Sequence, residues 1–179
     1  AARIVGIKNI IFFSSFTVHG SNQDEKNMIN EGDIYMPGHS YATSKIIGEY
    51  VIKDYSRFNN MNVIILRPTI VVGNLSGEEN ALNEFTRNAF NDEPIVIYGD
   101  GEHKREFISI SDLVNSVEKS IDYLEKNRGK NVCETFIISS GKPISMADLA
   151  INCVKNSGGG KVQHIEKSTQ AFSLLSNIS

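Results

Sequence analysis

Several features are scarce or missing in this sequence of 179 residues, and each absence argues against a class of protein. There is no Trp, and the two cysteines, Cys133 and Cys153, have no second Cys or His at metal-ligand spacing. A disulfide framework or a zinc site is therefore not expected, and the pair is typical of reduced thiols in a cytoplasmic protein. No apolar run approaches the roughly 20 residues that cross a bilayer, so we expect no membrane helix. No secretory leader is expected either, which favours a soluble protein located in the cytoplasm.

An excess of positive charge is also missing. Lys and Arg number 18 against 21 Asp and Glu, giving a net charge of −3 and a pI of about 5.8. Proteins that bind the nucleic-acid backbone carry a basic patch, so nucleic acid is not an expected partner. The remaining composition, with 40% apolar residues, 14 Gly and 22% charged residues, is ordinary for a globular domain of average size.

Short apolar runs alternate along the chain with segments of helical period. Residues 8–15 and 61–73 are rich in Ile, Val and Phe, which is typical of strands buried on both faces. Between them, apolar residues keep a helical period over residues 41–60, with Ser40 as the expected N-cap. Three further helices are expected, at residues 82–90, at 111–127 with Ser111 and Asp112 as the cap, and at 145–156. Further strands are expected at 94–98, 105–110, 135–139 and 161–165. This alternation predicts an α/β fold with a mainly parallel sheet.

Two side chains at the start of the helix over residues 41–60 suggest acid–base chemistry. Tyr41 and Lys45, in YATSK, lie four residues apart and share one face of the helix. A phenol ionises near pH 10, but a nearby ammonium group favours the phenolate and lowers the pKa by ~1–3 units. Tyr41 is therefore a candidate general base for taking the proton of an alcohol as that carbon is oxidised. Ser15, at the carboxyl end of the first strand, is a candidate for holding the substrate oxygen.

Four motifs, in a fixed order, carry a family resemblance. They are IIFFSSFTVHG, YATSK beginning 26 residues after Ser15, LRPTIVVG, and PIVIYGDGEHKREFISISDL. Together they resemble the landmarks of the extended short-chain dehydrogenase/reductase family, and within it the NAD-dependent sugar-nucleotide epimerases and dehydratases such as UDP-glucose 4-epimerase. The resemblance covers almost the whole chain. It implies the C-terminal portion of a Rossmann-type, doubly wound parallel sheet, together with a smaller substrate-binding α/β part.

The resemblance also implies roles for individual residues. Ser15, Tyr41 and Lys45 would be catalytic, with Lys45 also holding the nicotinamide ribose. The cofactor, NAD with NADP as the alternative, would be bound by Phe13, Ser14, Tyr41, Lys45, Pro68 and Thr69. The nucleotide-diphosphate sugar would be bound by Asn80, Val96, Tyr98 and Arg105. The assignment of Arg105 also has a chemical reason, because a guanidinium group matches a diphosphate in bidentate fashion.

Departures from the family pattern bear on the reaction. Dehydratases and related decarboxylases place an acidic residue directly after the serine segment, where this sequence has Phe16 and Thr17. Redox chemistry at one carbon remains, either transient, as in an epimerase, or net, as in a keto-sugar reductase, and an epimerase is our first expectation. Ile70 replaces an asparagine that contacts substrate in 4-epimerases, so a reductase or a 4,6-dehydratase stays open as an alternative. Two further residues have simpler interpretations, His19 as a loop histidine and Glu49 as a solvated carboxylate.

A Gly-rich phosphate-binding motif of the G-x-G-x-x-G type does not occur in the 179 residues. We therefore expect residues 1–75 to be the second half of an NAD(P)-binding domain, and residues 76–179 to be mostly a substrate-binding region with some elements returning to the sheet. On this view the chain is a portion of a larger enzyme. The rival hypothesis is a non-catalytic fragment that binds a nucleotide sugar or a partner. The resemblance further implies a homodimer through the Tyr41 helix and the helix at 82–90.

Overall fold

The computed structural model describes residues 4–20, 29–73 and 80–166. The chain divides into two units, each made of two segments of the sequence. The first unit is Ala1–Asn74 with Glu106–Lys142, and the second is Leu75–Arg105 with Pro143–Ser179. Among the described helices, none has the length and apolar character that a membrane crossing requires.

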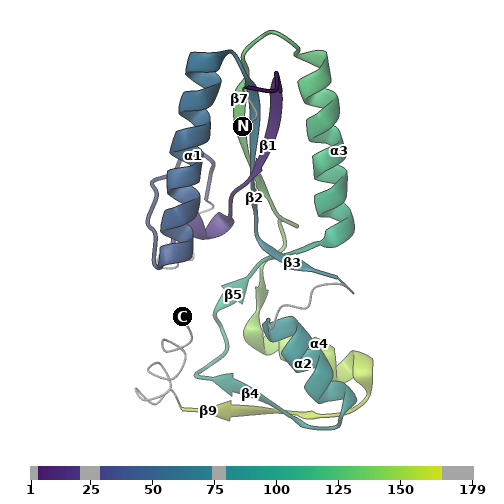
Figure 1. Cartoon of the computed structure of the whole chain (residues 1–179). Helices are drawn as coiled ribbons and strands as arrows, with labels where there is room; N and C mark the ends of the chain where they lie inside the picture. Colours follow the sequence, from purple (N-terminus) through teal and green to yellow (C-terminus); the bar gives the residue numbers. More distant parts are fainter. Residues whose placement is uncertain (1–3, 21–28, 74–79, 167–179) are drawn as a thin grey trace. The chain divides into compact units, whose positions relative to one another are not determined.

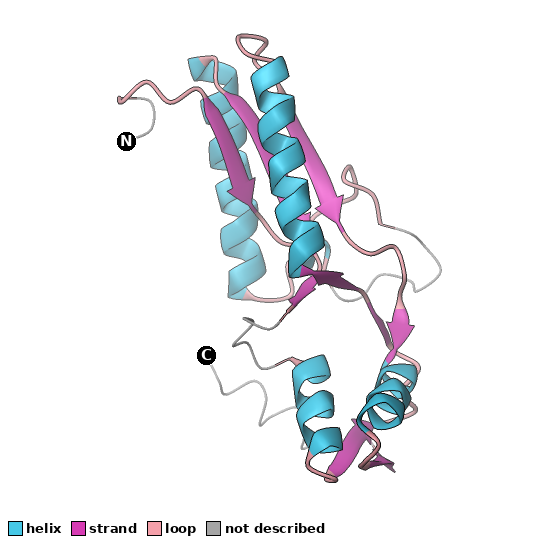
Figure 2. Ribbon diagram, turned by 90° about the vertical axis from the view of Figure 1, so that its right-hand side faces the viewer, coloured by secondary structure: helices cyan, strands magenta, loops and turns pink. Residues whose placement is uncertain are grey.

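Three parallel strands form the central sheet of the first unit. β1 (Asn9–Phe13) pairs with β2 (Asn62–Pro68), which pairs on its other side with β7 (Cys133–Ile138). α1 (Ser40–Asn59) covers one face of the sheet and α3 (Ile110–Lys126) covers the other, as Figures 1 and 2 show. Because both faces are covered, β2 is buried along nearly its whole length, as its apolar sequence predicts.

Packing on the two faces follows the alternation of side chains along β2. Ile64 and Leu66 lie in a buried cluster with Leu124 of α3. On the α1 side, Gly48 allows the helix to approach β1 closely, since a Cβ there would come within 2.5 Å of the ring of Phe12. Apolar packing of this kind holds α3 and α1 against the two faces of the sheet.

The run predicted as one strand over residues 61–73 is two strands in different sheets. β2 ends at Pro68, which has no N–H to continue the ladder, and the N–H of Thr69 donates to the carbonyl oxygen of Ile138. β3 (Ile70–Val72) then pairs in parallel with β6 (Phe107–Ser109). The chain thus leaves the central sheet at the proline.

Two predicted helix caps are displaced. His39, not Ser40, is the N-cap of α1, and its Nδ1 accepts a hydrogen bond from the N–H of Ala42 at 3.2 Å. Ser109, rather than Ser111 or Asp112, caps α3. Its hydroxyl accepts from the N–H of Asp112 and donates to the carboxylate of the same residue. The Ser109 hydroxyl thus satisfies one free N–H of the first turn, and the acidic residue three positions after the cap holds that hydroxyl in place.

The second unit combines two helices with short strands. β4 (Pro94–Tyr98) pairs in parallel with β9 (Lys161–Ile165), and β5 (Lys104–Arg105) pairs antiparallel with β8 (Ile144–Ser145). α2 (Ala81–Phe90) packs against α4 (Met146–Ser157). Every strand pair of the described residues except β5–β8 is parallel, so the predicted α/β fold is confirmed.

Candidate active site

Four of the six residues predicted to bind the cofactor lie at the carboxyl ends of β1 and β2. Phe13 ends β1 and is exposed, while Ser14 follows it and is buried. Pro68 ends β2, and Thr69 follows it with its N–H already used in a hydrogen bond to Ile138. Ligands of open parallel sheets bind beyond this edge of the strands, so these four predicted positions at the ends of β1 and β2 share a suitable location.

Tyr41 and Lys45 lie in the first two turns of α1. The Lys45 Nζ donates to the carbonyl oxygen of Phe13 at 2.9 Å and lies 5.4 Å from the centre of the Tyr41 ring. Tyr41 is half-exposed and stacks on His39, with their ring centres 6.0 Å apart. An ammonium group carries three N–H donors, so its bond to Phe13 leaves donors available beside the phenol.

Ser15 is the N-cap of the short helix η1 (Phe16–His19). Its side chain is buried, and its Oγ accepts hydrogen bonds from the N–H of Thr17 at 3.3 Å and from the Thr17 Oγ1 at 2.9 Å. Neighbouring Ser14 is held separately, because its N–H donates to the carbonyl oxygen of Leu66 and its hydroxyl donates to Glu49. Both serines therefore have defined orientations.

Beneath the candidate site lies a buried ion pair that the sequence interpretation missed. Glu49 of α1, expected to be solvated, is 0% exposed, and Arg67 of β2 is 1% exposed. Arg67 donates to both carboxylate oxygens of Glu49, from Nε at 2.9 Å and from a terminal nitrogen at 2.7 Å. Tyr41, Lys45 and Glu49 follow one another at four-residue spacing on one helix face, and this spacing is the sequence signal that could have indicated the position of Glu49.

Further groups complete this network. The Tyr35 hydroxyl donates to Glu49, and Arg67 reaches His19 at 3.0 Å and the carbonyl oxygen of Glu31 at 2.8 Å. The interpretation of His19 as an ordinary loop histidine is wrong, because it is fully buried. Burial and the adjacent Arg67 charge lower the pKa of His19, so the ring is neutral and accepts from the guanidinium group. The network ties β2, α1 and the segment before α1 to Ser14, which follows β1.

The ionisation of Glu49 predicts how stability depends on pH. Burial alone would raise its pKa, but hydrogen bonds from Arg67, Ser14 and Tyr35 lower the pKa from 4.5 to about 2. A carboxyl with a depressed pKa stabilises the fold above its unfolded value, and this contribution is lost as the pH falls from about 4.5 to about 2. We expect Glu49 to account for a loss of about 3 kcal/mol in the free energy of unfolding over that range.

Urea unfolding at stepped pH values measures this loss, with Glu49→Gln as the reference that cannot titrate. The difference in unfolding free energy between the two proteins isolates the contribution of this carboxyl. An equal pH slope in both proteins would contradict the prediction.

The residues predicted to bind substrate all lie in the second unit. Val96 and Tyr98 alternate with the buried Ile95 and Ile97, so they share the more exposed face of β4. Arg105 is exposed in β5.

Asn80 caps α2 through its Oδ1, and among the described residues its buried Nδ2 has no hydrogen-bond partner. A buried amide donor without a partner is costly, which makes Asn80 a reasonable ligand contact.

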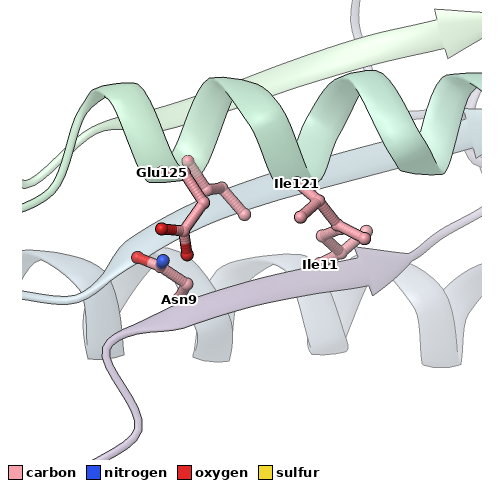
Figure 3. Close-up of a pocket in the computed structure, with 5 residues that line it drawn as sticks. Asn9, Ile11, Ile121 and Glu125 are labelled. Carbon is pink, nitrogen blue, oxygen red and sulfur yellow. The ribbon is translucent and has the colours of Figure 1, made fainter.

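A cavity of about 220 Å³ lies elsewhere in the first unit, between β1 and α3 (Figure 3). Asn9, Ile11, Ile121, Leu124 and Glu125 line it. Asn9 begins β1, whereas Ser15 follows the opposite end of that strand, so this cavity is not the candidate active site. In the described sheet β1 is an edge strand that pairs only with β2. The cavity therefore lies beside the open edge of that sheet.

Comparisons with known proteins bear on the family and the fold of the chain. The model of the NAD dependent epimerase/dehydratase family matches residues 1–133. The chain is 32% identical over 148 residues to dTDP-4-dehydro-6-deoxyglucose reductase of Escherichia coli, covering 80% of this chain and 44% of that protein. It is 28% identical over 144 residues to UDP-glucose 4-epimerase of Vibrio cholerae, covering 80% and 42%.

Among solved structures, UDP-N-acetylglucosamine 4-epimerase from Bacillus cereus superposes with a TM-score of 0.78 at 25% identity. The superposition covers 98% of this chain and 60% of that one. The chain therefore spans about half the length of the relatives that it matches.

Proposed function

The chain belongs to the NAD dependent epimerase/dehydratase family, and we propose that it carries the catalytic residues of a nucleotide-diphosphate-sugar epimerase that works by transient oxidation at one carbon. The observation that supports this most is the contact of Lys45 with both Phe13 and the Tyr41 ring, beyond the carboxyl end of β1. The segment after Ser15 offers Phe16 and Thr17, which have no carboxyl group for the proton transfers of a dehydration. An epimerase or a reductase needs no carboxyl group at this place.

The residues present fit one end of NAD. The Lys45 ammonium group, with donors left over after its bond to Phe13, suits the hydroxyls of the nicotinamide ribose. Phe13 and Tyr41 are exposed beside it, and Ser14, Pro68 and Thr69 lie along the same sheet edge. A Gly-rich cradle for the pyrophosphate is not found in the 179 residues, so this chain would contribute only the nicotinamide end of the site.

In the proposed reaction each residue has one task. Bound NAD supplies reversible acceptance of the carbon-bound hydrogen with its electron pair. Tyr41 takes the proton of the sugar hydroxyl as the carbon becomes a carbonyl, and returns it when the carbon is reduced on its other face. Lys45 stabilises negative charge on the Tyr41 oxygen, and Ser15 holds the substrate oxygen in place.

A reductase is the second candidate, because a relative with 32% identity is named as a dTDP-4-dehydro-6-deoxyglucose reductase. The two reactions differ in their electron balance. Proton NMR of the products, with NADH absorbance followed in parallel, separates them when the protein is given NAD with a UDP- or dTDP-sugar and, in a second assay, NADH with the corresponding keto sugar. An epimer formed without net change in NADH supports our proposal. Consumption of NADH by a keto sugar, loss of water, or nucleotide binding without turnover would each contradict it in favour of a reductase, a dehydratase or a binding fragment.

Arg105 provides a test of substrate binding that does not depend on turnover. We propose that Asn80, Val96, Tyr98 and Arg105 contact the nucleotide diphosphate, with Arg105 binding the phosphates. Charge-assisted hydrogen bonds are worth about 1.5–3 kcal/mol, so Arg105→Ala is expected to weaken binding of UDP or dTDP at least about tenfold. Isothermal titration calorimetry measures this, with the exposed Arg87→Ala of the same unit as the control. Equal affinities for the two variants would refute the role of Arg105.

The exposed face of α1 supports a homodimer as a further proposal. Ile47, Val51 and Phe58 are 57%, 51% and 73% exposed, and their spacing places them on one side of the helix. α2 offers no equivalent face at Phe85 and Ala89, since both are buried within the second unit. Phe90, which ends α2, is 72% exposed, however, so the proposed contact keeps both helices, α1 and α2. Sedimentation equilibrium measures the association, and a monomer at all accessible concentrations would contradict it.

A further inference from the structure

The hydroxyl of Ser15 has an unusually complete set of neighbours for a side chain that is expected to meet a ligand. Its Oγ accepts from the N–H of Thr17 at 3.3 Å and from the Thr17 hydroxyl at 2.9 Å. A serine hydroxyl has two acceptor lone pairs and one O–H donor. Both lone pairs are thus occupied by a single residue, and what remains for a ligand is the donor.

We propose that Thr17 is a positioning residue that locks the Ser15 hydroxyl as a hydrogen-bond donor, so that the site favours an acceptor oxygen. This inference rests on the proposed function. In that reaction the sugar hydroxyl becomes a carbonyl, whose oxygen can only accept hydrogen bonds. A Ser15 hydroxyl that can only donate a hydrogen bond complements the carbonyl oxygen of the keto form. A Ser15 hydroxyl that is free to rotate could equally accept a hydrogen bond from the starting alcohol. Thr17 would therefore stabilise the oxidised sugar relative to the alcohol.

The surroundings of Thr17 make it possible to remove its hydroxyl without disturbing the fold. The side chain of Thr17 is exposed, so a valine of similar shape fits there. Before it, Ser14 is anchored to Leu66 and Glu49; after it, Val18 is fully buried and His19 is held by Arg67. The backbone on both sides of Thr17 is thus fixed by contacts that do not involve its hydroxyl.

A thiol at position 15 tests the donor lock without any enzyme assay. In a Ser15→Cys variant that also carries Cys133→Ser, to remove the exposed native thiol, the thiolate would accept the same two hydrogen bonds. Adding Thr17→Val removes one of them and is expected to raise the pKa of the introduced thiol by about one unit, whereas Thr17→Ser should restore it. The pH dependence of its alkylation rate gives this pKa. The same pKa with and without the Thr17 hydroxyl would overturn the lock.

Turnover then tests the catalytic consequence. We expect Thr17→Val to lower kcat about tenfold with little change in KM or melting temperature, and Thr17→Ser to retain wild-type kcat. Thr86→Val, which removes a hydroxyl in the second unit, is the matched control. Unchanged kcat in Thr17→Val, or a matching fall in melting temperature, would overturn the positioning role. Turnover retained by Tyr41→Phe would instead overturn the proposed function, and the thiol measurement would still judge the lock by itself.

Discussion

Replacing Tyr41 with Phe is expected to lower kcat by about 10²–10⁴-fold, the usual contribution of a positioned general acid–base group. The change removes one oxygen and keeps the ring that stacks on His39 and lies beside the Lys45 ammonium group. Because the side chain is 51% exposed, the folded state should lose little stability. Steady-state kinetics with NAD and a nucleotide sugar measures the effect.

The matched control for this variant is Tyr55→Phe. Tyr55 lies on the same helix and is exposed to a similar degree, but it is 14 residues further from the sheet edge that carries Ser15. We expect its kcat to equal that of the wild type. Comparable rates in Tyr41→Phe and Tyr55→Phe would remove Tyr41 from the mechanism, and the epimerase proposal would then have no base.

Replacing Glu49 with Ala is expected to reduce the free energy of unfolding by about 3–5 kcal/mol. The carboxylate receives hydrogen bonds from Arg67, Ser14 and Tyr35, and its loss leaves the guanidinium group of Arg67 buried and unpaired. Buried charges without a partner are costly because the protein interior cannot solvate them. Such a loss is a large part of the 5–15 kcal/mol that stabilises a typical domain.

Chemical denaturation measures this change, with Glu125→Ala as the comparison. Glu125 pairs with Arg128 at the end of α3, where both side chains are exposed, so that variant should lose less than about 1 kcal/mol. If the two alanine variants unfold at the same denaturant concentration, the Glu49–Arg67 pair contributes no more to the free energy of unfolding than an exposed ion pair. Loss at Glu49 alone supports a network that carries much of the stability of the first unit.

The local part of the fold could be predicted from the sequence. The strands at 94–98 and 161–165 have the predicted bounds, and the helix over 41–60 is displaced by only one residue, because apolar period and turn residues are local properties. Pairing is not local. The proline at position 68 cannot donate a hydrogen bond to a sheet, but nothing local indicates that the residues after it pair with Phe107–Ser109, far along the chain. Caps also depend on which hydroxyl or imidazole reaches the free N–H groups, so His39 and Ser109 could not be told from their neighbours.

In the candidate site, too, contacts within one helix could be predicted from the sequence, and contacts between distant segments could not. The contact of Lys45 with the Tyr41 ring could be predicted from their spacing within one helix, whereas the contact of Lys45 with Phe13 needs the sheet. Glu49 appeared solvated because its partner, Arg67, sits 18 residues later in an apolar strand. A charged residue within such a strand is itself a sign that a buried counter-charge must exist.

The buried pair also constrains how this protein can evolve. Replacing both members of such a pair by apolar side chains often costs no stability, but each single replacement leaves one buried charge without a partner. A lineage that loses Arg67 before Glu49, or the reverse, passes through an intermediate that folds poorly. We therefore expect the two positions to be retained together or exchanged together among descendants of this sequence, so that a change at either one marks a change at the other.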